Sequence, residues 1–263
     1  MLYEYYGFAY SPMVAAFSWS IIIGVGAYLA VFKLPIFDSL LKEPLAAPTM
    51  VLPAAMFSFL MVFMASQAWQ NISQARTALI NEHSALVRLV TVSDEPPEAK
   101  QKMHAAIRGY LTAVIDDEWV KNHNHDGVAA ADAALADLQA VIWAIDAACQ
   151  LRARSERPCT NGLAISSLVK GLDDLRLARE QRLSLGYQGG LPLKWTLAIS
   201  LAFVTSLTLA AIHRSSPRTA AISLGLFSLA IWLSFSVVTL TIQPYRGPDA
   251  LSPAMLQAIR DKL

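Results

Sequence analysis

PTMVLPAAMFSFLMVFMASQAW, residues 48–69, continues directly into QNISQARTALINEHSALVRLV, residues 70–90, and together they indicate the architecture of the chain. Its first half is apolar and long enough to cross a membrane as a helix. In its second half, apolar residues recur at spacings of three, four and seven, which is typical of an amphipathic helix. The next prolines are Pro96 and Pro97. We therefore expect one helix from Pro48 to about Val92 that leaves the bilayer and enters a helical domain.

Charge is distributed unevenly along the 263 residues, of which only 16% are charged. A soluble globular protein usually carries about 25%. Of the 41 charged residues, 29 lie between Gln70 and Lys194. This pattern predicts two membrane blocks on either side of a soluble insert. The net charge of +1 gives no reason to expect a nucleic-acid partner.

Four apolar blocks are long enough to be transmembrane helices, at about 13–32, 48–69, 195–212 and 219–242. No basic segment precedes the first block, so we do not interpret it as a cleaved signal peptide. None of the four contains Asp, Glu, Lys or Arg. This argues against a proton-coupled transporter and against a cation filter built from charged side chains.

The predicted architecture is all-α, with four transmembrane helices and a cytoplasmic helical bundle inserted between the second and the third. We divide the chain into a first membrane hairpin (1–69), the helical domain (70–194), a second membrane hairpin (195–242) and a tail (243–263). Periodicity predicts three further soluble helices at about 98–121, 126–154 and 162–185, and a short amphipathic helix in the tail. No alternating strand pattern is present.

Four spans place both termini and the helical domain on the same side of the membrane. Lys and Arg near the membrane number roughly seven on that side against four in the short loops, which favours the cytoplasm of a bacterial inner (plasma) membrane. Cys149 and Cys159 are ten residues apart and match no metal signature. We interpret them as two ordinary thiols, consistent with a cytoplasmic location.

The sequence contains no motif of a known enzyme class, including the P-loop, GxGxxG, HExxH and GxSxG. His123 and His125 are the closest histidine pair, but no further ligands complete a metal site, so we expect a solvated loop. Asp116, Asp117 and Glu118 are consecutive and point around a helix rather than toward one substrate. We therefore predict no catalytic residue, no cofactor, no metal and no enzyme.

The best candidate for a pore wall is one face of the span at 48–69. Met56, Phe59 and Phe63 are spaced by three and four residues, and Leu60 lies on the same face. If the helix is repeated around a symmetry axis, these side chains form a hydrophobic constriction that gates by dewetting, with Gln67 at its exit. The alternative is packing against other helices or lipid. One such span per subunit requires several subunits, so the pore interpretation implies a homo-oligomer.

Three arginines at spacings of three lie on one broad face of the helix at 162–185, namely Arg176, Arg179 and Arg182. They line either a vestibule that concentrates anions or a set of structural ion pairs. Glu82, in the polar half of the opening stretch, is expected to pair with another soluble helix.

Four segments together resemble the bestrophin-like domain family of bacterial and plant membrane proteins. They are SQAWQNISQARTALINEHSAL (66–86), GYLTAVIDDEW (109–119), LDDLRLAREQRLS (172–184) and QPYRGPDALSP (243–253). The resemblance covers nearly the whole chain. It implies structural roles for five residues in these motifs: Tyr110, Glu118, Trp119, Pro244 and Gly247.

The wider similarity is to bestrophins, which are pentameric anion channels with a hydrophobic neck on the second membrane helix. It implies a homopentamer in membrane lipid that conducts small inorganic anions such as chloride past Met56, Phe59 and Phe63. Bestrophins form a calcium clasp from an acidic cluster after the fourth span. This sequence has Asp249 there without such a cluster, so we expect no clasp. The alternative function is a membrane-anchored signalling or scaffold protein whose cytoplasmic helices bind a partner.

Overall fold

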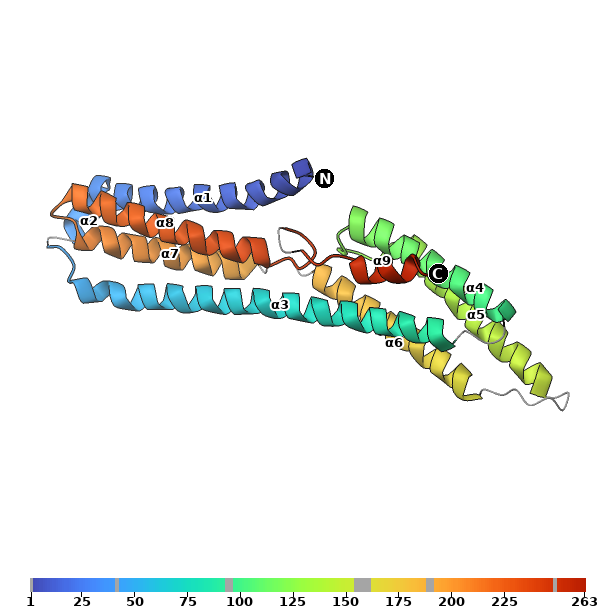
Figure 1. The fold of residues 1–263 in the computed structure, drawn as a ribbon. Coiled ribbons are helices and arrows are strands. Elements are labelled where there is room, and N and C mark those ends of the chain that lie inside the picture. The colour runs from blue at the N-terminus through green and yellow to red at the C-terminus, as the bar shows by residue number, and fades with distance from the viewer. Residues whose placement is uncertain (1, 41–42, 93–96, 154–161, 188–191, 248–249) are drawn as a thin grey trace. The chain divides into compact units, whose positions relative to one another are not determined.

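The computed structural model describes residues 2–40, 43–92, 97–153, 162–187, 192–247 and 250–263. Within these ranges the chain forms helices joined by turns, without a strand (Figure 1). The chain divides into two compact units. The first unit comprises residues 1–72, 189–243 and 247–249, and the second comprises residues 73–188, 244–246 and 250–263.

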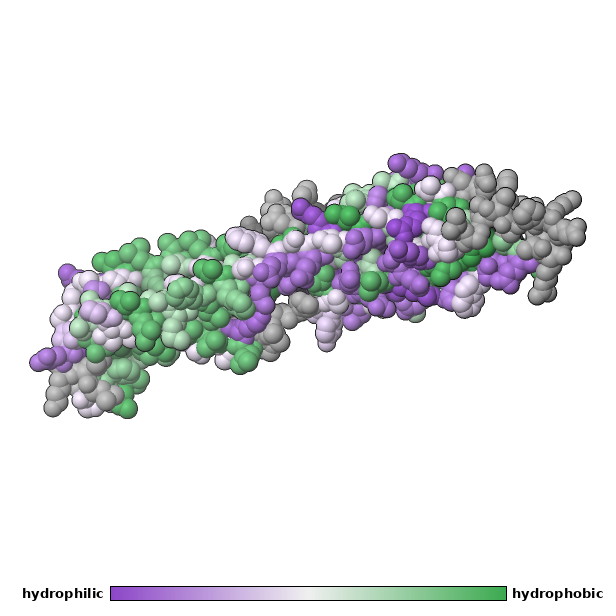
Figure 2. All heavy atoms as spheres, turned by 90° about the horizontal axis from the view of Figure 1, so that it is seen from below, coloured by the Kyte–Doolittle hydropathy of each residue, from purple (hydrophilic) through white to green (hydrophobic). Residues whose placement is uncertain are grey.

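The first unit contains the apolar helices. These are α1 (Leu2–Lys33), α2 (Pro35–Leu40), the short 3-10 helix η1 (Ala47–Met50), the first half of α3 (Val51–Val92), α7 (Pro192–Ile212) and α8 (Pro217–Thr241). The face of this unit in Figure 2 is mostly hydrophobic. Helices that are apolar all round are suited to lipid. This unit therefore has the surface of a membrane domain.

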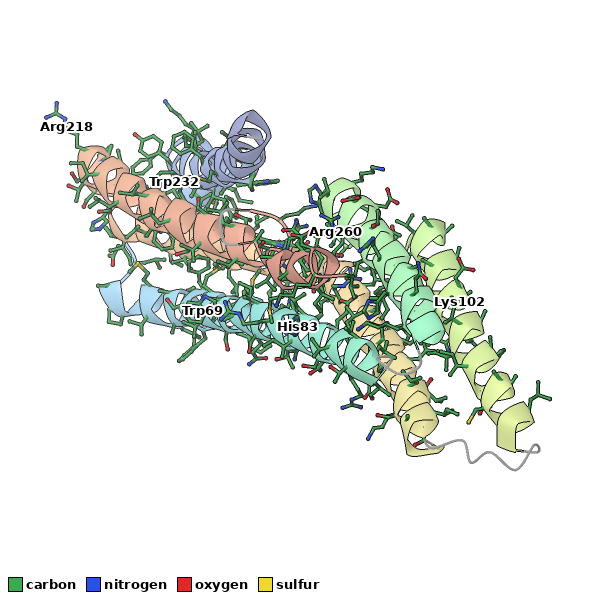
Figure 3. All side chains as sticks on the ribbon, turned by 45° about the vertical axis from the view of Figure 1, so that its right-hand side comes forward. Trp69, His83, Lys102, Arg218, Trp232 and Arg260 are labelled. Atoms are coloured by element: carbon green, nitrogen blue, oxygen red, sulfur yellow. The ribbon has the colours of Figure 1, made fainter. Side chains whose placement is uncertain are left out.

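Small residues allow α1, α7 and α8 to pack closely. Ala27, Ala202 and Ala210 are fully buried, and a Cβ added at Gly24 would lie 2.3 Å from the hydroxyl oxygen of Ser228 on α8. Close helix approach at small residues is a general feature of membrane bundles. Trp232 lies on the side of α8 that faces α1 (Figure 3), and its indole nitrogen donates to a main-chain carbonyl of α1 over 3.3 Å.

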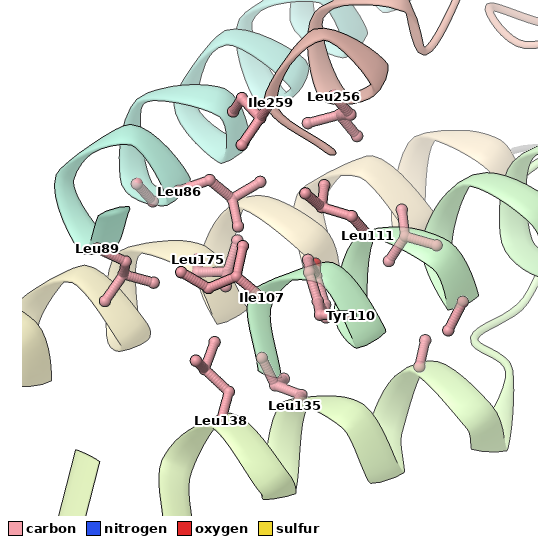
Figure 4. Packing of buried hydrophobic residues seen from close by; sticks show 14 of the residues in the cluster. Leu86, Leu89, Ile107, Tyr110, Leu111, Leu135, Leu138, Leu175, Leu256 and Ile259 are labelled. Atoms are coloured by element: carbon pink, nitrogen blue, oxygen red, sulfur yellow. The ribbon is translucent and has the colours of Figure 1, made fainter. Parts of the chain in front are cut away.

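The second unit is a bundle built around leucine and isoleucine. It contains the second half of α3, then α4 (Pro97–Thr112), the π-helix η2 (Ala113–Lys121), α5 (Ala129–Ala153), α6 (Gly162–Tyr187) and α9 (Ala254–Arg260). Every one of these helices contributes to the core, in which ten residues are labelled in Figure 4: Leu86, Leu89, Ile107, Tyr110, Leu111, Leu135, Leu138, Leu175, Leu256 and Ile259. The segment after α8 belongs to this core through Tyr245, Leu256 and Ile259.

The prediction of one helix through residues 48–92 is confirmed, because α3 is continuous from Val51 to Val92. The other predicted helices are present with ends within a few residues, except that α1 begins at Leu2 rather than near Met13. Helix α2 was not predicted from the sequence. Pro35 occupies the first helical position, where a missing N–H costs nothing.

Two further findings depart from the sequence predictions. By length and composition, five helices rather than four are candidates to cross a membrane, because residues 129–151 of α5 also qualify. Cys149 is disulfide-bonded, so the interpretation as an ordinary thiol is wrong for this residue. Cys159 and Asp249 lie outside the described residues.

Candidate functional site

In the first unit, α3 presents an apolar face that the chain itself leaves uncovered. Met56, Phe59 and Phe63 are 51%, 76% and 54% exposed, and Val62 beside them is exposed as well. The opposite face of the helix is buried in the cluster formed with α7 and α8, through Phe57, Met61 and Met64. The three residues predicted to form a constriction therefore share one exposed face. Val62 was missed by sequence reasoning, although it lies three residues after Phe59.

The four long apolar segments of this unit are covered to different extents. The apolar window of α3 is 17% buried, against 39%, 33% and 28% for those of α1, α7 and α8. Helix α3 is thus the membrane helix of this unit that depends most on something outside the subunit to cover it.

One charged group lies next to this face. The ammonium group of Lys194, in the first turn of α7, donates a hydrogen bond to the side-chain oxygen of Gln67 on α3. The same nitrogen lies 5.7 Å from the centroid of the Phe63 ring, within the range of a cation–π interaction. Gln67 was predicted at the exit of the constriction, and the structure brings Lys194 to it.

In the second unit, two arginines of α6 and two glutamates form a buried charge cluster. Arg182 donates to Glu82 of α3 over 2.7 Å and to Glu118 of η2 over 2.9 Å. Arg179 donates to Glu118 over 2.5 Å and 3.0 Å. The side chains of Glu82, Glu118 and Arg182 are fully buried, and that of Arg179 is 8% exposed. The cluster therefore joins α3, η2 and α6 through charges that water does not reach.

Three neutral groups complete the hydrogen bonds of this cluster. The hydroxyl of Tyr110 on α4 donates to Glu82 over 2.7 Å. The side-chain oxygen of Asn124 accepts from Arg182, and the backbone N–H of Val128 donates to Glu118 over 3.3 Å. Asn124 has φ 57°, in the left-handed region that asparagine tolerates better than most residues. A fifth segment of the unit, the loop after η2, is thus held to the same cluster.

Trp119 connects the buried charge cluster to the segment after α8. Its ring packs edge-on against Tyr245, with centroids 5.3 Å apart, and the Arg182 guanidinium carbon lies 5.4 Å from the Trp119 ring. The indole nitrogen donates to the carbonyl of Leu251 over 3.2 Å, and the Leu251 N–H donates to the carbonyl of Pro244 over 2.9 Å. These contacts fix the turn that contains the Pro-Tyr-Arg-Gly sequence.

Electrostatics keeps these groups in single protonation states. Burial lowers the pKa of Arg182, but Glu82, Tyr110 and Glu118 raise it by more, so the net shift is upward. Burial, followed by the charge of Glu82, raises the pKa of Tyr110 well above its usual value of 10.0. Arg182 therefore remains a cation and Tyr110 a hydrogen-bond donor throughout the physiological pH range.

The remaining predicted residues lie apart from the cluster. Arg176, also on α6, is half-exposed, and its guanidinium group donates to the side-chain oxygen of Gln139. A second guanidinium nitrogen lies 3.9 Å from a carboxylate oxygen of Asp173. Pro244 is buried, and Gly247 has φ 104°, a conformation that favours glycine. His125 pairs with Asp126 over 2.6 Å on the surface. No group of three or more metal-ligating side chains occurs in the described ranges.

The three consecutive acids point in different directions, as their spacing predicted. Asp117 pairs with Lys121 over 2.5 Å, Asp116 lies 3.5 Å from Arg260, and only Glu118 is buried. They do not converge on a shared cavity as a hydrolytic pair would.

The first unit and its apolar helices define a helical membrane protein. A model of the bestrophin-like domain matches residues 14–256, which is nearly the whole chain. The chain therefore belongs to the bestrophin-like domain family.

The fold is shared with solved bacterial bestrophins. A crystal structure of a mutant bacterial bestrophin homologue from Klebsiella pneumoniae matches with a TM-score of 0.62 and 14% identity, over 95% of this chain and 97% of that chain. A second structure of the Klebsiella pneumoniae homologue, solved by zinc phasing, matches with a TM-score of 0.58 and 15% identity, over 95% and 94%. Comparison with curated protein sequences finds no match.

Proposed function

We propose that this protein is a homo-oligomeric ion channel, selective for small inorganic anions such as chloride. The constriction of its pore is the apolar face of α3, formed by Met56, Phe59 and Phe63, with Gln67 at the exit. The family resemblance implies five subunits. Both termini and the second unit lie in the cytoplasm of a bacterial inner membrane in this proposal.

The observation that carries this proposal is the uncovered face of α3. A large aromatic such as Phe59, 76% exposed on a helix whose other side is packed, is covered either by lipid or by another subunit, and the low burial of the whole apolar window of α3 (17%) favours another subunit. Repetition of α3 around an axis would bring these rings together into a narrow apolar ring. Such a ring stays dry when narrow and conducts when widened, and it favours weakly hydrated ions.

Four of the five candidate helices span the membrane in this proposal, and α5 does not. One stripe of α5 is buried in the core of the second unit through Ala131, Leu135, Leu138 and Ile142. Its other faces carry exposed Asp132 and Asp137. An aspartate near the middle of a membrane helix, as Asp137 would be, costs about 3 kcal/mol. Asp132, in the first turn of α5, is paired with Arg179 of α6 over 2.7 Å. Helix α5 is therefore better placed in water.

The orientation rests on the balance of Lys and Arg near the spans, and the disulfide at Cys149 weighs against it, because disulfides are rare in the cytosol. Fusion of a fluorescent protein or alkaline phosphatase to the C-terminus distinguishes a cytoplasmic C-terminus from one on the opposite side of the membrane. Fluorescence without phosphatase activity is expected, and the opposite result would reverse the proposed orientation.

The channel itself is tested by reconstituting the purified protein in planar bilayers. We expect current carried mainly by chloride, and a higher conductance for Phe63→Ala, because a smaller ring lowers the dewetting barrier. Leu226→Ala is the matched control: Leu226 is 66% exposed on α8 and is not part of the proposed constriction. Absence of current from the wild-type protein under applied voltage, tension or ligands would refute the proposal.

The scaffold alternative makes a different prediction. A signalling or scaffold protein has no need of a central axis, so the purified protein would be monomeric or dimeric. Native mass spectrometry of the detergent-solubilised protein decides between the two, and we expect a closed ring of identical subunits.

A further inference from the structure

We propose that Lys194 sets the charge selectivity of this pore, by holding an unneutralised ammonium group at the exit of the constriction. The inference rests on the proposed channel function and deepens it, since it assigns the preference for anions to one side chain. The nitrogen of Lys194 is hydrogen-bonded to Gln67 and lies 5.7 Å from the Phe63 ring centroid. Phe63 and Gln67 are the last two residues of the proposed pore face.

The position of Lys194 along the helix places its charge at one end of the first unit. Among the side chains described in this unit, the other formal charges lie at the C-terminal end of α1 (Lys33), before η1 (Glu43), in the turn after α7 (Arg214) and in the first turn of α8 (Arg218). Lys194 is at the opposite end of α7 from that turn. Of these described charges, Lys194 is therefore the one next to Gln67.

The partners of Lys194 hold its charge without cancelling it. The amide of Gln67 is a neutral acceptor, and the face of Phe63 attracts a cation only through its quadrupole. Among the described residues no carboxylate forms an ion pair with Lys194, whereas Arg179 and Arg182 are paired with Glu82 and Glu118. The ammonium group keeps its full charge and is fixed at two points beside the pore face.

The expected size of the effect follows from Coulomb's law. At a distance of about 6 Å and with the dielectric constant of bulk water, one elementary charge raises the local concentration of chloride about threefold and lowers that of potassium by a similar factor. Salt weakens the effect, so it is measured at low ionic strength. The ordinary alternative is a lysine that only reaches the membrane interface to hydrate its charge, and such a lysine leaves selectivity unchanged.

The test is the reversal potential of the reconstituted full-length protein in asymmetric KCl. For Lys194→Gln we expect the chloride-to-potassium permeability ratio to fall about tenfold at low ionic strength, which is the product of the two threefold changes, while Lys194→Arg keeps the wild-type ratio. Arg218→Gln is the control, because Arg218 is an exposed cation at the other end of the membrane helices. An unchanged ratio in Lys194→Gln would overturn the inference and leave the channel proposal intact.

A second variant tests the same charge without removing the lysine. Gln67→Glu keeps an acceptor for Lys194 but neutralises it, so we expect the same fall in the permeability ratio. This variant decides the question if Lys194→Gln does not assemble, and a wild-type ratio in Gln67→Glu overturns the inference. A wild-type protein that prefers potassium, or that passes no current, overturns both the inference and the proposed function.

Discussion

Replacement of Arg182 by methionine tests whether the buried charge cluster holds the second unit together. Met fills a similar volume but makes none of the hydrogen bonds of Arg182 to Glu82, Glu118 and Asn124. Glu82 is then left buried without a cation, and Glu118 keeps only Arg179. Removal of one partner of a buried ion pair costs about 3–5 kcal/mol. At about 3 °C per kcal/mol, the temperature of thermal unfolding should fall by about 10–15 °C.

Trp119 supplies the assay, because its ring contacts both Arg182 and Tyr245. It is one of six tryptophans, so the measurement uses a background in which the other five are replaced by phenylalanine and the fluorescence comes from Trp119 alone. Arg176→Met is the matched control, since Arg176 lies on the same helix but is half-exposed, and its loss should cost less than about 1 kcal/mol. In Glu82→Gln/Arg182→Met the unpaired charge is gone, so stability should partly return. The reasoning is refuted if Arg182→Met and Arg176→Met unfold at the same temperature. It is also refuted if the double variant is no more stable than Arg182→Met alone.

Three further predictions concern the same unit. Tyr110→Phe removes a buried hydrogen bond to Glu82 and should lower the free energy of unfolding by about 1.5–3 kcal/mol in a denaturant titration; no change would show that Glu82 finds another donor. Gly186→Ala should be strongly destabilising, because the new Cβ would lie 1.9 Å from the carbonyl oxygen of Asn124. In Gly109→Ala the new Cβ has open space, so this variant should stabilise α4 by up to about 1 kcal/mol. A higher melting temperature for Gly186→Ala than for Gly109→Ala would contradict this geometry. Burial raises the pKa of both Tyr110 and Tyr245, so their protonated forms contribute stability that is present below pH 10 and is lost only as the pH rises beyond it. In an ultraviolet titration these two phenols should therefore ionise only when the protein unfolds. Ionisation of all eight tyrosines before unfolding would refute their burial.

Local pattern was sufficient to predict α3 and the residues that share one of its faces. The segment is apolar and then amphipathic, with no proline between Pro53 in the first turn and Pro96, so nothing interrupts the hydrogen-bond ladder. Met56, Phe59 and Phe63 share a face because of the 3.6-residue period alone. That this face is uncovered was not predictable, because burial depends on which other helices pack against α3.

The partners in the buried charge cluster were beyond local pattern for a related reason. Glu82 and Arg182 are 100 residues apart, and each has closer charged residues in the sequence. The π-helix at Ala113–Lys121 was also missed: it buries the adjacent residues Glu118 and Trp119 together, where an α-helical pattern was expected to continue.

Lys194 shows how an error at a helix boundary hides a residue that we propose to be functional. We placed the third span at Trp195, so its neighbour was assigned to the soluble domain, but α7 begins at Pro192. Proline is favoured in the first turn of a helix, and this signal was present in the sequence. With that start, Lys194 lies in the first turn of α7, within reach of Gln67.

For the anion channel that we propose, the burial of Arg179 and Arg182 changes which residues can attract anions. On sequence grounds the three arginines of α6 were candidates to line a vestibule and concentrate anions. Two of them are balanced by Glu82 and Glu118 inside the bundle, and Arg179 is also paired with Asp132 at the surface over 2.7 Å, so each of these two charges is already neutralised by a carboxylate. Arg176 is the remaining one, and it lies near Asp173. Lys194, which has a neutral amide as its acceptor, is the cation beside the pore face whose field is not cancelled, and it is therefore the position at which a change of charge should alter which ions pass.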